Sequence, residues 1–233
     1  MAQPVYNLSR LKGKVIAIDG PAGSGKSTTA KLVAARLGYR YLDTGAMYRA
    51  ITYLAMEHGI PLSDEAKLRA LAMGVTIDFE TGEDVNRVFV NGHDITQEIR
   101  TPEVTRNVSE VSAHPQVRKA MVEKQREMAK SGSIVAEGRD TTTVVFPEAD
   151  LKVYLDAALR TRAERRLIDM ARLGVSTNLP DVEGDLARRD KLDSERASSP
   201  LTKAKDARLV DTSNTTIEDQ VERILTLFKA AVL

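Results

Sequence analysis

The sequence predicts a three-layer α/β protein with a central five-stranded parallel sheet, built around a phosphate-binding loop. Residues 20–27 form a complete G-x-x-x-x-G-K-[ST] motif between a short apolar run and a helical pattern, which is where such a loop must lie. Four further short apolar runs follow, each separated from the next by helical pattern. This alternation is typical of a doubly wound sheet, in which ligands bind at the carboxyl ends of the strands.

The first strand and the helix after it hold the loop. The strand is predicted at 15–18, and the helix repeats apolar residues at Ala30, Val33, Ala34 and Leu37, the spacing of one buried face. Glycines let successive N–H groups turn inward around phosphate, and the helix N-terminus adds positive potential. Lys26 supplies a charge for the β- and γ-phosphates, and the Ser27 hydroxyl suits Mg²⁺. The residues expected to bind a nucleoside triphosphate are Gly20, Pro21, Ala22, Gly23, Ser24, Gly25, Lys26, Ser27 and Thr28.

The other four strands are predicted from short apolar runs, each followed by polar residues. The runs are Tyr39 to Leu42, Ile134 to Ala136, Leu151 to Leu155, and Leu209 to Val210. Because the carboxyl ends of parallel strands meet at one edge, the polar residues there are site candidates. They are Asp19, Asp43-Thr44-Gly45, Glu137-Gly138-Arg139-Asp140 and Asp156.

Two segments complete the architecture. Between about residues 75 and 100 apolar residues alternate and run into Asn91-Gly92, a strong turn dipeptide, which predicts a small antiparallel insert. Thr215 and Glu218 predict a capping box before a final amphipathic helix. We expect one domain over 1–233, with a core at about 13–70 and 130–233, the insert at about 71–110 and a lid at about 160–190.

Composition excludes several classes of function. The chain of 233 residues carries 34 Lys and Arg against 33 Asp and Glu, so its charge does not indicate nucleic-acid binding. The absence of cysteine excludes disulfides and a thiolate nucleophile. With no apolar stretch near the roughly 18 residues of a membrane span, we expect a soluble, cytoplasmic protein without a membrane partner. A balanced charge without a long exposed apolar run makes a monomer the simpler expectation.

Two short clusters suit a second substrate. Thr44 can cap a helix in which Arg49 lies, an arrangement that suits a second phosphate, although an ordinary capped helix with a surface arginine fits as well. Arg139 and Asp140 follow a buried strand, where they suit a nucleotide's phosphate and base, with a salt-bridged turn as the alternative.

The third cluster is an arginine-rich lid between Leu159 and Arg196. Leu159, Ala163, Leu167 and Met170 form its apolar stripe. A helix-poor stretch is expected from Gly174 to Gly184. Arginines that close over a transferred phosphoryl group stabilise its charge, but for Arg160 and Arg172 a solvated helix face is equally expected. The polar residues of this segment are Arg160, Arg162, Arg165, Arg166, Arg172, Arg188, Arg189, Asp193 and Arg196.

These clusters, in this order behind the phosphate loop, resemble the bacterial cytidylate kinases, the CMP/dCMP kinases of the nucleoside monophosphate kinase group. The resemblance runs from about Val15 to the C-terminus. The phosphate loop is shared by many proteins, whereas the Gly-Arg-Asp and Thr-Val-Val-Phe-Pro run together with the insert is far more specific. The matching segments are Ile18 to Pro21, Leu42 to Arg49, Glu98 to Thr101, Pro115 to Arg118, Gly138 to Asp140 with Thr143 to Pro147, and Arg189 to Arg196.

The resemblance implies roles for individual residues. The insert would enlarge the monophosphate-binding arm. The cytosine ring would be contacted by Ser109, Arg118 and Asp140; the acceptor phosphate would be held by Arg49, Arg139 and Arg196 with help from Thr44; and the sugar hydroxyls would be reached by Arg189 and Asp193. Thr44 stands where the family usually has serine, which keeps the hydroxyl and adds a methyl group.

The expected reaction is ATP plus CMP or dCMP giving ADP plus CDP or dCDP, with Mg²⁺. Positioning and charge neutralisation should carry most of the rate, through Lys26, Mg²⁺ and the lid arginines Arg162, Arg165 and Arg166. Spacing does not choose among these arginines, and Asp43 either binds Mg²⁺ through water or caps its own helix.

Two rival functions would require different sequence features. A phosphate-loop kinase for UMP, AMP or a non-nucleotide alcohol would differ in the acceptor pocket. A GTP-dependent switch or an RNA-binding protein is disfavoured, because the chain lacks an Asn-Lys-x-Asp motif and only 4% of its residues are aromatic.

Overall fold

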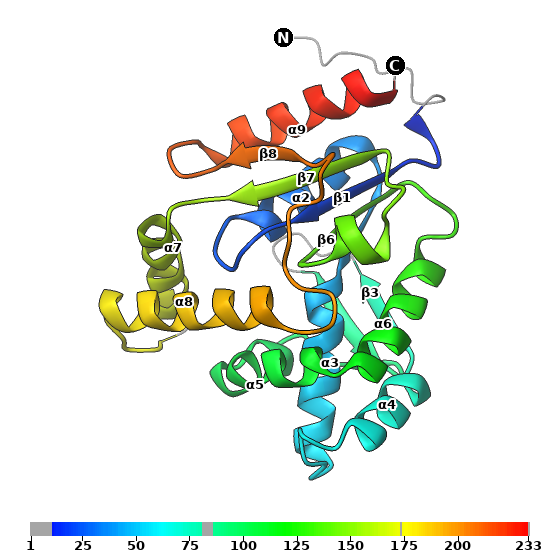
Figure 1. The fold of residues 1–233 in the computed structure, drawn as a ribbon, viewed down its shortest axis with the longest axis vertical. Coiled ribbons are helices and arrows are strands. Elements are labelled where there is room, and N and C mark those ends of the chain that lie inside the picture. Colours follow the sequence, from blue (N-terminus) through cyan, green and yellow to red (C-terminus); the bar gives the residue numbers. More distant parts are fainter. Residues whose placement is uncertain (1–10, 81–85, 173, 233) are drawn as a thin grey trace.

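A five-stranded parallel sheet forms the centre of the molecule (Figure 1). The computed structural model describes residues 11–80, 86–172 and 174–232. Each predicted strand is confirmed, and all neighbouring pairs in the order β2-β6-β1-β7-β8 are parallel. The strands are β1 (Val15–Asp19), β2 (Arg40–Asp43), β6 (Ile134–Gly138), β7 (Leu151–Asp156) and β8 (Arg208–Asp211).

Helices cover both faces of this sheet, because successive side chains of each strand point to opposite sides. In β6, Val135 packs in the layer of α2 (Lys26–Leu37) and α9 (Ile217–Val232), whereas Ile134 and Ala136 pack in the opposite layer. That second layer contains α3 (Thr44–Glu57) and α6 (Pro115–Met128). The predicted face of α2 at Ala30, Val33, Ala34 and Leu37 is buried, as expected.

The predicted antiparallel insert is a three-stranded sheet. It consists of β3 (Ile77–Glu80), β4 (Arg87–Val90) and β5 (His93–Asp94), in that order. Asn91 and Gly92 both have positive φ angles, 51° and 82°, as a tight hairpin turn between β4 and β5 requires. Beside it in the chain lie α4 (Glu65–Gly74), a 3-10 turn (Glu98–Arg100) and α5 (Pro102–Ala113).

Two helices, α7 (Leu159–Arg172) and α8 (Leu179–Glu195), project together from one side of the molecule (Figure 1). Their apolar contact joins Ala163 to Val182 and Leu186, and it includes Ala22 of the phosphate loop. The predicted helix-poor stretch from Gly174 to Gly184 is too long, because α8 begins at Leu179. Asn178 caps α8 by accepting from the Asp181 N–H, and Gly184 lies inside the helix.

The predicted capping box of α9 is wrong by one residue. Thr216, not Thr215, caps the helix, and its hydroxyl accepts a hydrogen bond from the Asp219 N–H at 3.2 Å. Asp219 in turn accepts from the Thr216 N–H and hydroxyl. Glu218 instead pairs with Arg36 of α2 at 2.5 Å, so its charge joins two helices rather than closing a cap.

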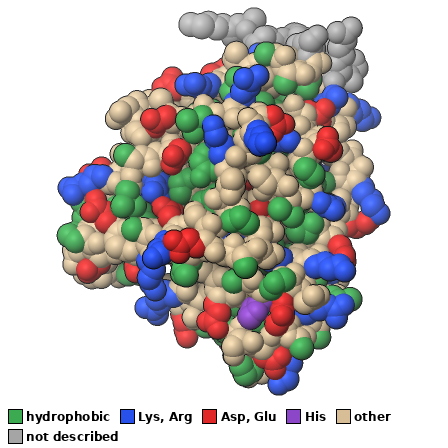
Figure 2. Space-filling model, viewed as in Figure 1, with side chains coloured by type: hydrophobic (Ala, Val, Ile, Leu, Met, Phe, Trp, Pro, Cys, Tyr) green, Lys and Arg blue, Asp and Glu red, His purple; other side chains and the backbone are tan. Residues whose placement is uncertain are grey.

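The surface is mixed in charge. Figure 2 shows Lys and Arg side chains interspersed with Asp and Glu over the visible face. Among the described residues, no helix combines the length and the apolar character needed to cross a membrane.

Candidate active site

A cavity of about 530 Å³ lies at the carboxyl ends of β1, β2 and β6. Its size is that of a small-molecule site. The predicted residues that line it are Ala22, Gly23, Gly25, Lys26, Ser27, Thr28, Asp43, Thr44, Arg49, Ser109, Arg118, Arg139, Asp140, Arg165, Arg166, Arg189, Asp193 and Arg196. The structure therefore brings together residues from both ends of the chain. Gly20, Pro21, Ser24 and Arg162 are not part of the lining.

The phosphate loop lies directly against β7. A Cβ atom on Gly20, whose φ is +148°, would lie 1.9 Å from the Leu155 carbonyl oxygen, so only glycine fits there. Lys26 is buried, and its Nζ donates to the Pro21 carbonyl at 2.7 Å. Burial, and then the charge of Arg139, lower the pKa of Lys26 to about 7. A bound phosphate would oppose both effects and favour the charged lysine.

Glu137, a strand-end candidate without a predicted role, lies beside the loop. Its Oε1 accepts from the Ser27 hydroxyl at 2.5 Å and from the Tyr41 hydroxyl at 2.9 Å. Burial, followed by the nearby Asp43 carboxylate, raises the pKa of Glu137. The sequence indicated Glu137 only through its position at the end of the buried strand β6. Its contact with Ser27 could not be predicted, because the two residues are far apart in the chain.

Asp43 caps its own helix, whereas Thr44, which was expected to cap it, is the first helical residue and donates its hydroxyl to the Glu137 carbonyl. The Oδ1 of Asp43 accepts from the Ala46 N–H at 2.7 Å, and its Oδ2 accepts from Arg49 at 2.8 Å. Asp43 also lines the cavity, as do Ser27 and Glu137. Hydroxyl and carboxylate oxygens are the donors that Mg²⁺ prefers, so this group of side chains fits a magnesium ion.

Guanidinium groups gather next to the phosphate loop. Arg139 donates to Asp193 at 2.8 Å, whereas the buried Nε of Arg189 has no hydrogen-bond partner among the described residues. Burial, and then the charge of Arg139, lower the pKa of Arg189 to about 10, and Arg49 and Arg166 act in the same direction. Several cations with unused donors at one end of a cavity form a site for an anion such as phosphate.

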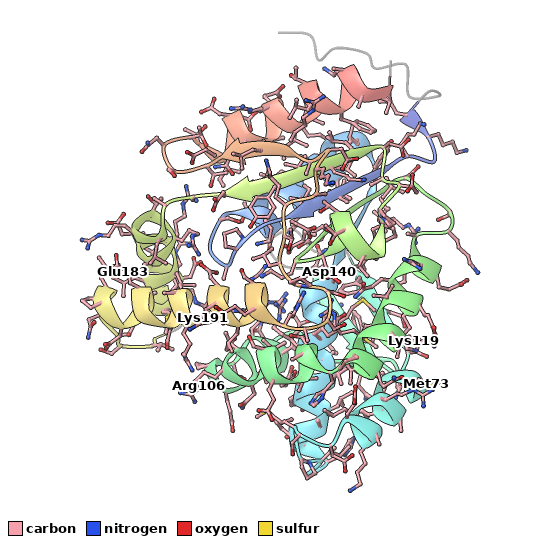
Figure 3. All side chains as sticks on the ribbon, viewed as in Figure 1. Met73, Arg106, Lys119, Asp140, Glu183 and Lys191 are labelled. Atoms are coloured by element: carbon pink, nitrogen blue, oxygen red, sulfur yellow. The ribbon has the colours of Figure 1, made fainter. Side chains whose placement is uncertain are left out.

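A buried ion pair between Arg118 and Asp140 also lines the cavity. Arg118 donates to Asp140, and both side chains are almost fully buried. The Nη2 atom of Arg196 lies 3.9 Å from the second oxygen of Asp140. Asp140 lies in the interior between the sheet and α3, whereas Met73 lies at the periphery on α4 (Figure 3).

Arg118 has further contacts that the sequence did not indicate. It donates to the Ser112 carbonyl at 2.9 Å, and its guanidinium lies 5.1 Å from the centroid of the Tyr48 ring. Tyr48 and Ser112 also line the cavity. Ser109 is in the lining as expected.

The three lid arginines lie in different environments. Arg162 donates to the Ala22 carbonyl at 3.1 Å and to Asp190 at 2.6 Å, which fixes it beneath the phosphate loop rather than in the cavity. Arg165 lines the cavity and donates to the Thr212 carbonyl at 2.6 Å, and Arg166 also lines the cavity. Arg160 and Arg172 are exposed and pair with acidic neighbours, as a solvated helix face would.

Comparisons with known proteins agree with this geometry. The family model described as "Cytidylate kinase" matches residues 16–230. A cytidylate kinase of Bacillus cytotoxicus is 48% identical over 217 residues, covering 93% of this chain and 96% of the relative, and one of Bacillus cereus is 48% identical over 212 residues, covering 91% and 94%. A crystal structure of an uncharacterized protein from Eubacterium ventriosum has a TM-score of 0.53 at 10% identity, covering 93% of this chain and 99% of that one, and thus shares the fold.

Proposed function

Because the chain belongs to the cytidylate kinase family, we propose that it transfers the γ-phosphoryl group of ATP to CMP or dCMP. An oxygen of the acceptor phosphate forms a bond to the γ-phosphorus, and the bond from that phosphorus to the β–γ bridging oxygen breaks. The products are ADP and CDP or dCDP. The acceptor oxygen is already an anion near neutral pH, so positioning and charge neutralisation carry the rate rather than a strong base.

The observation that carries the proposal is the juxtaposition of two different sites in one cavity. A phosphate loop with Lys26 lines one part, and an arginine cluster beside the buried Arg118–Asp140 pair lines the other. A switch protein needs only the first. An enzyme that phosphorylates a nucleotide needs both, since a second phosphate and a second base must be held next to the first nucleotide.

The chain's own residues divide the work. Lys26 and the cavity-lining Arg165 and Arg166 would stabilise the transferred phosphoryl group. Arg162 would support the phosphate loop through Ala22. Ser27, with Asp43 and Glu137 lining the same cavity, would hold Mg²⁺, which would supply charge neutralisation for the phosphates.

At the acceptor end, the contacts favour Arg49, Arg139 and Arg189 for the phosphate. The pKa of Arg189 is lowered to about 10 by its burial and then by Arg139, so a dianion would relieve this repulsion. Arg196, which is expected on the same phosphate, lies 3.9 Å from Asp140, and its Nη2 group has no hydrogen-bond partner among the described residues. Asp140 would accept from the amino group of cytosine, which uracil lacks.

The reaction is tested with a coupled assay of ADP formation, offering CMP, dCMP, UMP, AMP and GMP separately with Mg-ATP. Turnover largely confined to CMP and dCMP is expected. Turnover with another acceptor would leave the phosphate loop in place and reject the base assignment.

The base assignment has its own test in Asp140→Asn. A hydrogen bond to a charged group contributes about 1.5–3 kcal/mol, so kcat/KM for CMP should fall about 10- to 100-fold while that for UMP falls much less. Unchanged selectivity between CMP and UMP would remove Asp140 from the base-reading role.

A further inference from the structure

The carboxylate of Asp19 joins two segments that the cavity requires. Asp19 is the last residue of β1 and is fully buried. Its Oδ1 accepts from the Thr141 N–H at 2.8 Å and hydroxyl at 2.5 Å, and its Oδ2 accepts from the Thr142 N–H at 2.7 Å and hydroxyl at 2.6 Å. Both oxygens are therefore held by two donors each.

The two linked segments belong to different halves of the site. Asp19 directly precedes Gly20, where the phosphate loop begins, and Thr141 directly follows Arg139 and Asp140. Thr141–Val145 form a single π-helical turn. One carboxylate thus connects the donor loop to the turn that presents the acceptor-binding residues.

The sheet alone does not fix this relation. Hydrogen-bonded pairing between β1 and β6 ends with Asp19 opposite Gly138, and both functional segments begin beyond that point. Charge-assisted hydrogen bonds are shorter and about twice as strong as neutral ones. Burial raises the pKa of the Asp19 carboxyl, and the bonds from Thr141 and Thr142 act in the opposite direction. A buried carboxylate is costly unless its partners satisfy it, so a purely packed role would be served better by an apolar residue.

We propose that Asp19, Thr141 and Thr142 form a clamp that sets the position of the phosphate loop relative to Arg139 and Asp140. This inference rests on the proposed function, because it concerns how two bound nucleotides are aligned. Asp19 is a positioning residue in this proposal, since it lies outside the cavity lining. Loss of the clamp would leave each nucleotide able to bind and would misalign the acceptor oxygen and the γ-phosphate.

Thr142→Val is the sharpest test, because among the described residues the Thr142 hydroxyl bonds to Asp19 alone, while the backbone N–H bond remains. Thr52→Val is the matched control: Thr52 is also fully buried, and within the described part of the chain its hydroxyl makes one bond, to the Tyr48 carbonyl of α3. Each change deletes one buried hydroxyl. The measurements are the melting temperature, the Kd of each nucleotide alone by calorimetry, and kcat by ADP formation.

The clamp predicts a specific division of effects. Both variants should lose similar thermal stability, but Thr142→Val should lower kcat about tenfold with each Kd changed less than about twofold, because a misplacement of 1 Å costs about 100-fold. Thr142→Ser should restore kcat. Asp19→Asn should lose more of kcat than Thr142→Val does. The NH₂ group of the asparagine would face a backbone N–H, and two donors cannot form a hydrogen bond.

Equal kcat values for Thr142→Val and Thr52→Val would overturn the clamp, as would a loss confined to the Kd of one nucleotide. The comparison is made with whichever acceptor the unmodified protein phosphorylates. Failure of CMP as a substrate therefore counts against the proposed function, and failure of the Thr142 comparison counts against the clamp.

Discussion

Removing the Asp140 carboxylate should destabilise the ligand-free protein strongly. Arg118 and Arg196 are both almost fully buried, and among the described residues Asp140 is the carboxylate within ion-pair distance of each of them. Deleting one partner of a buried pair leaves an uncompensated charge, which costs about 3–5 kcal/mol. Asp140→Ala should therefore lower the free energy of unfolding by about that amount, out of a total that is about 5–15 kcal/mol for most proteins.

A second substitution distinguishes this cause from lost packing. Arg118→Met in the Asp140→Ala background removes one stranded guanidinium, although it also loses the bond to the Ser112 carbonyl and the contact with the Tyr48 ring. The double variant should be more stable than the sum of the two single changes predicts, by about 2 kcal/mol.

Urea unfolding at neutral pH without nucleotide, followed by circular dichroism, measures all four members of this cycle. If the losses of unfolding free energy in the two single variants add up to the loss in the double variant within about 0.5 kcal/mol, the measurement refutes the reasoning, because additive losses are those of residues that do not interact. A cost for Asp140→Ala below about 1 kcal/mol would show that the two arginines find water or other partners.

Three further predictions concern the donor side of the cavity. The pKa of Lys26 is lowered to about 7 mainly by burial, and a bound triphosphate raises it, so ATP binding should take up about 0.9 proton at pH ~8 and about 0.1 at pH ~6. Calorimetry in buffers of different ionisation enthalpy measures this uptake; Lys26→Met should remove it, and equal uptake at both pH values would contradict it. Glu137→Gln, which keeps acceptors for Ser27 and Tyr41, should raise the half-saturating Mg²⁺ concentration about tenfold in the ADP assay, and an unchanged value would exclude Glu137 from the magnesium site. Gly20→Ala should cost at least about 2 kcal/mol in urea unfolding, because its Cβ would overlap the Leu155 carbonyl, while Gly184→Ala, with nothing within 4 Å, should not destabilise; equal stability of the two variants would contradict this.

The sheet was predictable because local signals and the global fold agree. Each strand is a short apolar run, and the phosphate-loop motif alone orients the first strand and helix. The hairpin at Asn91-Gly92 was predictable for the same reason, since few residues adopt two successive positive φ angles. These features depend on residues close together in the chain.

Features that depend on competition between partners were harder to predict. Thr215 and Thr216 both match a cap pattern locally, and the pairing of Glu218 with Arg36 on another helix accompanies the choice of Thr216. Arg162 and Arg165 lie in the same arginine-rich segment, yet contacts with Ala22 and Asp190 hold Arg162 under the loop. The partners lie far apart in sequence, so spacing carried no information about them.

Three neighbouring strands stop at one level where the cavity begins. Asp43 at the end of β2 pairs with Glu137 of β6, and Asp19 at the end of β1 pairs with Gly138, the next residue of β6. A single residue inserted between Gly138 and Arg139 would advance the following chain by about 3.3 Å and turn Arg139 and Asp140 to opposite sides. Because a Cβ on Gly138 would lie 2.3 Å from the Thr44 hydroxyl oxygen, the end of β6 also has no room for a side chain at this position. The length of the chain up to this edge is therefore as strictly determined as the side chains that follow it.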